Sequence, residues 1–197
     1  MPTLDSRCRA ILTLLLQSDG PLTSAEIGLR LGTTARMVRY SLSEGKWLRK
    51  GETVIVVPAS CASKFKGDVR TVKAGDSLAH RGLKVEVVPA YNIGKEFHPK
   101  EAGGVGYIVT TVEGMRVYHA GDTDLIPEME NITADVALLP VGGKYTMDAE
   151  QAARAANLIR PKLAIPMHWG THVDSRQNAE RFRELCKVEV RILKPQP

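Results

Sequence analysis

The sequence predicts an α/β (α+β) protein in which an N-terminal helical module precedes a sheet covered by helices. Apolar residues recur at helical spacing over residues 7–43. From Thr53 onward the spacing changes to the short β-branched and alternating runs that are typical of strands. Strands first follow one another and then alternate with helical segments, which favours a mixed sheet with helices packed on it.

The first module, residues 1–50, is expected to contain three helices. Each shows one apolar face or a capping residue at its start, over residues 7–17, 25–31 and 35–43. Gly32 suits the left-handed position that follows the second helix, so a tight turn is expected before the third. The segment that begins at Trp47 would form a short wing or simply lead into the second module.

The segment LTSAEIGLRLGTTARMVRYSL resembles the helix-turn-helix of many prokaryotic regulators. The resemblance implies that the third helix presents its polar face to the major groove of DNA. The residues expected to contact bases or phosphates are Thr33, Thr34, Arg36, Arg39 and Tyr40. The alternative is a three-helix packing or dimerisation module with a basic face.

The distribution of charge also distinguishes the two modules. Residues 1–66 contain ten Lys and Arg against five Asp and Glu, whereas the rest of the chain contains seventeen of each. The formal net charge of +5 therefore lies in the first third. A basic module beside a neutral one indicates a polyanionic partner, and here that partner is expected to be DNA.

The second module, residues 51–197, carries the strand patterns. Strands are expected at residues 53–57, 68–72, 84–88, 106–112, 116–120, 136–139, 163–166 and 189–193. Helical patterns lie between some of them, at residues 59–65, 125–129, 147–159 and 175–186. His80 is expected in an exposed turn, within SLAHRG.

Two polar residues stand directly after predicted strands. Asp122 follows VYHAG and His168 follows LAIPM, which is how a metal site is built at the carboxyl edge of a sheet. Asp122 would alternatively stabilise a structural turn, and His172 competes with His168. By alternation along its strand, His119 is expected to point away from Asp122 and to pack or support rather than to bind a metal.

Four motifs resemble the metal-dependent hydrolase branch of the metallo-β-lactamase superfamily: VEVVPAYNIGKEFHPKEAGGVGYIV, VYHAGDTDLIPEM, DVALLPVGGKYTMDAEQAA and PKLAIPMHWGT. The resemblance implies an αββα architecture, of which this chain holds the C-terminal half. It also implies three metal ligands. His98, or the neighbouring Asn92, would bind a first metal, His168 would bind a second, and Asp122 would bridge them. Such a centre, with zinc or another divalent metal, activates water to attack an ester, amide or phosphoester.

The His-x-His-x-Asp-His motif that supplies the other ligands in that family does not occur in this sequence. Each metal would then have about two protein ligands, whereas catalytic zinc usually has three and a water. The isolated chain is therefore not expected to be an efficient hydrolase, and no catalytic residue is assigned.

The absence of that motif leaves three interpretations. The first is a DNA-binding regulator in which a helix-turn-helix is fused to an incomplete hydrolase fold. The alternative is a hydrolase whose active site is completed by a partner chain. The third is a rearranged gene product. The missing half would leave an apolar face of the sheet uncovered, unless the N-terminal helices or a second subunit cover it. A homo-oligomer or a partner chain is therefore expected.

A cytoplasmic location without a membrane span is expected. The three cysteines are far apart in the sequence and read as reduced thiols. The N-terminus shows no signal-peptide pattern, and the longest apolar run is too short to cross a bilayer.

Overall fold

The computed structural model describes residues 54–65, 67–169 and 176–193. The chain divides into two units, and the larger one comprises residues 58–60 and 71–192. The predicted helix-turn-helix, with Thr33, Thr34, Arg36, Arg39 and Tyr40, lies outside the described residues, as does His172. The boundary at residue 50 and the contacts with DNA stay predictions.

Two strands form a sheet of their own. Strand β1 (Val54–Pro58) pairs with β2 (Asp68–Val72), and the 3-10 helix η1 (Ala59–Lys64) connects them. The predicted strands at 53–57 and 68–72 are confirmed.

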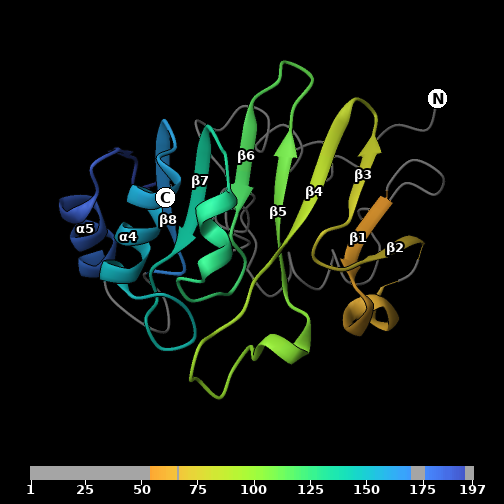
Figure 1. Cartoon of the computed structure of the whole chain (residues 1–197), viewed down its shortest axis with the longest axis horizontal. Coiled ribbons are helices and arrows are strands. Elements are labelled where there is room, and N and C mark those ends of the chain that lie inside the picture. The colour runs from red at the N-terminus through yellow and green to blue at the C-terminus, as the bar shows by residue number, and fades with distance from the viewer. Residues whose placement is uncertain (1–53, 66, 170–175, 194–197) are drawn as a thin grey trace, which may run out of the picture. The chain divides into compact units, whose positions relative to one another are not determined.

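The larger unit is built on a seven-stranded sheet with the order β3-β4-β5-β6-β7-β8-β9 (Figure 1). Neighbouring strands are antiparallel from β3 to β6 and parallel from β6 to β9. The strands are β3 (Ser77–His80), β4 (Leu83–Pro89), β5 (Val105–Thr110), β6 (Arg116–His119), β7 (Val136–Pro140), β8 (Leu163–Met167) and β9 (Glu189–Val190).

Two α-helices pack together at the β7–β8 end of this sheet (Figure 1). Helix α4 (Ala149–Ile159) contacts β7, and α5 (Arg176–Leu185) contacts β8. Helix α4 begins with a capping box between Asp148 and Gln151. Apart from Ile159, its buried residues are alanines, whose small side chains allow a close approach to the sheet: Ala149, Ala152, Ala153, Ala155 and Ala156. Two further 3-10 helices, η2 (Lys100–Ala102) and η3 (Pro127–Asn131), lie in the connections.

The strand register gives the two faces of the sheet different surroundings. Residues paired across antiparallel or parallel neighbours share a face. One row is fully buried and contains Ile108, Tyr118, Ala137 and Ala164. The adjacent row, on the opposite face, is aliphatic throughout but only half-buried, and contains Val85, Val109, Val117, Val136 and Leu163. This row of the second face is therefore not fully covered, whereas Val87, Leu138 and Ile165, two residues further along their strands on the same face, are buried.

The sequence missed strand β3 and misplaced His80. That residue ends β3 and is half-buried, so the predicted exposed turn is wrong. The turn lies one step later, at Arg81 and Gly82, which both have positive φ (51° and 82°) and close a hairpin with β4. Strand β9 is also shorter than predicted. No helix among the described residues is long and apolar enough to cross a membrane.

Candidate functional site

Four chain segments meet at one edge of the larger sheet because of the strand directions. Strands β6, β7 and β8 are parallel, and β4 runs in the same direction because β5 is antiparallel to both β4 and β6. Their carboxyl ends therefore share an edge. The segments that follow them carry His98, Asp122, Tyr145 and His168.

Asp122 stands between two histidines at this edge. The Nε2 atom of His168 lies 3.0 Å from Oδ1 of Asp122, and the Nε2 atom of His98 lies 3.5 Å from Oδ2. All three side chains are partly exposed, by 40% for His98 and Asp122 and by 50% for His168. The structure thus brings together the three residues that the sequence singled out, with one histidine at each carboxylate oxygen.

The backbone at the two histidines is unusual. His98 and His168 both have positive φ, 54° and 59°, a region that side-chain-bearing residues seldom adopt. A glycine allows the chain to approach His168: a Cβ on Gly142 would lie 3.0 Å from the His168 carbonyl oxygen. The short turn after β6 depends on Gly121, with φ 71°. The edge is therefore built from tight turns that place the side chains of His98 and His168 beside Asp122.

The charges of Asp122 and His168 stabilise each other. The hydrogen bond from His168 lowers the pKa of Asp122, and the bond to Asp122 raises the pKa of His168. The charges of Asp122 and His168 also act on His119. Desolvation and the charge of His168 lower the pKa of His119, and the charge of Asp122 opposes this shift. Its Nδ1 atom accepts a hydrogen bond from the backbone N–H of Gly121 at 3.2 Å. The supporting role that alternation predicts for His119 stays a prediction.

The ring of His98 is oriented by a backbone carbonyl. Its Nδ1 atom lies 3.2 Å from the carbonyl oxygen of Tyr145, which only accepts hydrogen bonds, so Nδ1 is the donor. In a neutral ring the lone pair is then on Nε2, which faces the Asp122 carboxylate. Two acceptors that face each other in this way suit a shared cation or proton.

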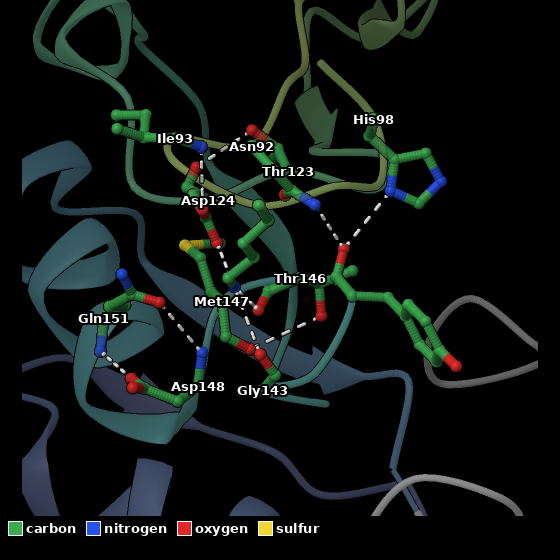
Figure 2. A network of polar contacts seen from close by, with 12 residues as sticks. Asn92, Ile93, His98, Thr123, Asp124, Gly143, Thr146, Met147, Asp148 and Gln151 are labelled. Atoms are coloured by element: carbon green, nitrogen blue, oxygen red, sulfur yellow. Dashed lines mark hydrogen bonds and ion pairs between the residues drawn. The ribbon is translucent and has the colours of Figure 1, made fainter.

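Two further residues lie at this edge: Asn92, the alternative to His98 as a ligand of the first metal, and Asp124, which was not identified from the sequence. Asn92 is buried, and its amide donates hydrogen bonds to the carbonyl oxygens of Phe97 and Tyr145, both at 2.8 Å. Asp124 is also buried and pairs with Lys95. Figure 2 shows these contacts joining the segment of Asn92 and His98 to the segment that leads into α4. Their partners are mainly backbone atoms of distant segments, which no local sequence pattern reveals.

The donors at this edge fit part of a metal centre. Asp122 offers one oxygen to each of two positions, and each position has one histidine nitrogen beside it. Among the described ranges, however, no three His, Cys, Asp or Glu side chains are grouped so as to hold one ion. Two donors at each position are one fewer than catalytic zinc usually has. The described residues therefore do not complete a catalytic metal site by themselves.

Known proteins match the chain over the region that carries this edge. A family model described as a β-lactamase superfamily domain matches residues 57–168. A metal-dependent hydrolase of Nitratidesulfovibrio vulgaris is 38% identical over 167 residues, which cover 82% of this chain and 59% of that protein. A metal-dependent hydrolase of Methanopyrus kandleri is 40% identical over 141 residues, covering 65% of this chain and 61% of that protein.

Solved structures give the same match. A crystal structure from Parabacteroides distasonis, of a protein assigned as a metal-dependent hydrolase, has a TM-score of 0.65 and 36% identity. The match covers 77% of this chain and 69% of that one. The chain spans only about three fifths of the length of the first curated relatives, from 59% to 61% for the two named above.

Proposed function

Because this chain belongs to the β-lactamase superfamily, we propose that it forms part of a metal-dependent hydrolase whose active site is completed by a partner chain. The arrangement of Asp122 carries the proposal: one histidine approaches each of its two oxygens, at 3.0 and 3.5 Å. A carboxylate that is shared in this way suits a bridge between two metal ions. The similarity to metal-dependent hydrolases supports the class of reaction.

The missing donors support the need for a partner. A bridging carboxylate with one histidine on each side leaves both positions incomplete, and the sequence contains no His-x-His-x-Asp-His motif to complete them. Such loosely held positions would bind metal weakly. A partner that contributes two or more donors would raise the number at each position to what catalysis requires.

The half-buried face of the sheet offers a place for that partner. The row of Val85, Val109, Val117, Val136 and Leu163 is aliphatic from β4 to β8. His119 lies on the same face, because it pairs with Leu138 and follows Val117 by two residues. It is exposed. A chain that packs on this row would therefore lie beside His119, three residues before Asp122 in the sequence.

The bound metals would supply a nucleophilic hydroxide from water and would polarise the bond to be hydrolysed. Asp122 would hold both positions, and His98 and His168 would each hold one. The carbonyl oxygen of Tyr145 fixes the proton of His98 on Nδ1 and leaves Nε2 free as a donor atom. Esters, amides and phosphoesters are the proposed substrates.

The test measures the zinc affinity of the full chain by chelator competition. It is done at low and high protein concentration, and with and without the segment of the Nitratidesulfovibrio vulgaris relative that this chain does not cover. We expect weak binding by the chain alone and tight binding, near two equivalents, when the segment is added. Hydrolysis of a nitrophenyl ester and of a nitrophenyl phosphodiester should appear under the same conditions.

The matched control is the variant Asp122→Ala/His168→Ala, which should lose the gain in affinity. Lys162→Ala changes an exposed residue of the same unit and should keep it. If affinity rises with protein concentration alone, the partner is a second copy of this chain. Equal zinc binding by the native and the double-variant proteins under every condition would overturn the proposal.

A further inference from the structure

Lys95 occupies an unusual position for a lysine. It lies in the irregular segment between β4 and η2, three residues before His98, and its side chain is only 25% exposed. Lysine side chains are seldom withdrawn from water unless the ammonium group is paired. Lys100 and Lys144, on either side of the same region, are instead exposed. The contacts of Lys95 therefore call for a specific explanation.

Three acceptors surround the Lys95 ammonium group. The Nζ atom lies 2.5 Å from Oδ1 of Asp124, 2.7 Å from the carbonyl oxygen of Thr146 and 3.1 Å from that of Gly143. An ammonium group has three protons, so all of its donors are used. The three acceptors come from two segments, the one after β6 and the one after β7 (Figure 2).

Asp124 completes the connection from the other side. Its side chain is 3% exposed, and its Oδ2 atom accepts a hydrogen bond from the backbone N–H of Ile93 at 2.9 Å. Its backbone N–H donates to the carbonyl oxygen of Tyr91, also at 2.9 Å. The Lys95–Asp124 pair thus holds the His98 segment at Tyr91, Ile93 and Lys95.

The same two segments share one further acceptor. The carbonyl oxygen of Tyr145 receives hydrogen bonds from the Asn92 amide and from Nδ1 of His98, at 2.8 and 3.2 Å. Tyr145 lies between Gly143 and Thr146, the two residues whose carbonyl groups Lys95 holds. Movement of residues 143–146 would therefore displace the Tyr145 carbonyl oxygen from Nδ1 of His98.

We propose that Lys95 is a positioning residue: paired with Asp124, it holds the carbonyl of Tyr145 against His98 and so fixes which ring nitrogen faces Asp122. Without Lys95, the segment over residues 143–146 loses two of its bonds to the His98 segment. The His98 ring is then free to rotate and to exchange its proton between nitrogens. Only the expected effect on metal binding rests on the proposed function. The tautomer of the His98 ring depends on this chain alone.

The experiment records the ring nitrogen signals of His98 by NMR in the alkaline plateau of their pH titration, where the ring is neutral. Native protein should show one tautomer, with the proton on Nδ1. The variant Lys95→Met keeps the length of the side chain but removes its charge and its donors. Its signals should shift toward the mixture of tautomers of a free imidazole. Lys162→Met, which changes an exposed ion pair with Asp135 away from this edge, should leave them unchanged.

Removal of Lys95 alone leaves a buried carboxylate unpaired and risks misfolding. The double variant Lys95→Met/Asp124→Asn avoids that charge, and its asparagine oxygen still accepts from Ile93. Asp148→Ala lowers stability at the start of α4 without touching Lys95, and so controls for loss of stability by itself. The double variant should show the tautomer mixture, and Asp148→Ala should not. Native His98 signals in a folded double variant would overturn the proposal.

Zinc affinity provides a second measurement. In the presence of the completing segment, loss of Lys95 should weaken binding about 10-fold or more, which is the usual effect of residues that orient a metal ligand. Failure of the native chain to bind zinc under any condition would count against the proposed function. It would leave the NMR result on His98 to decide the role of Lys95.

Discussion

His98 and His168 come from distant segments, yet both hold the left-handed backbone conformation, with φ of 54° and 59°. Each presents Nε2 to a different oxygen of Asp122. Strained backbone at non-glycine residues is concentrated at functional sites, because the surrounding structure must compensate for it. The shared conformation therefore supports a role for both rings beyond packing.

A comparison of glycine and alanine at position 168 tests this strain. Both substitutions remove the ring, but only glycine adopts positive φ without a steric penalty. His168→Gly should therefore be more stable than His168→Ala by about 1 kcal/mol. Urea unfolding followed by circular dichroism measures the difference. At Arg154, exposed within α4, the order should reverse, because glycine is about 1 kcal/mol less favourable than alanine in a helix. The same order at both positions would contradict the left-handed conformation of residue 168.

The Asp122–His168 pair predicts a window of pH in which it contributes to stability. The pKa of Asp122 is lowered from 3.8, so its contribution is present above pH 3.8 and is lost as the pH falls through the folded value. The pKa of His168 is raised from 6.5, so its contribution is present below pH 6.5 and is lost as the pH rises through the folded value. Asp122→Asn should therefore cost most between pH 3.8 and 6.5.

The size of that effect should not exceed about 1 kcal/mol, because the carboxylate is 40% exposed and solvent screens the pair. Unfolding free energies of native and Asp122→Asn protein, compared across pH, measure it in the absence of metal. Asp68→Asn changes an exposed pair with Arg70 and serves as the control. A cost that increases steadily above pH 7 would show that the pairing with His168 is wrong.

Sequence reasoning located the main parts of this site but not their support. Asp122 and His168 were found because each follows an apolar strand, and a strand end is a local pattern. Asp124 differs from Asp122 by two positions, yet it is buried against Lys95, which lies 29 residues earlier. Such a pairing depends on how loops from separate strands meet. Strand β3 was missed for a related reason, since four residues with weak alternation resemble a turn.

The capping box of α4 predicts a stability effect that is separate from the site. Oδ1 of Asp148 accepts from the backbone N–H of Gln151 at 2.7 Å, and the Gln151 side chain accepts from the backbone N–H of Asp148 at 3.1 Å. Asp148→Ala should cost about 1 kcal/mol, and Asp148→Ser should recover most of it. Thermal unfolding measures both. A loss that serine does not restore would show that the capping bond is not the cause.

The basic N-terminal third predicts a measurable effect of salt on DNA binding, if the helix-turn-helix interpretation is right. Each lysine or arginine that contacts a phosphate releases about one counterion, so binding weakens steeply as salt rises. Arg36→Ala/Arg39→Ala should weaken binding to duplex DNA and reduce the slope of log affinity against log salt by about 1 for each phosphate contact removed. Fluorescence anisotropy at several salt concentrations gives the slope. Arg154→Ala removes one positive charge from the surface of α4 and should leave the slope unchanged. Equal slopes for all the proteins would show that Arg36 and Arg39 do not contact DNA phosphates, and that the basic charge of the N-terminal third is a general property of its surface. The partner-completed hydrolase would then be the one remaining interpretation with a specific structural basis, in the pairing of Asp122 with His98 and His168.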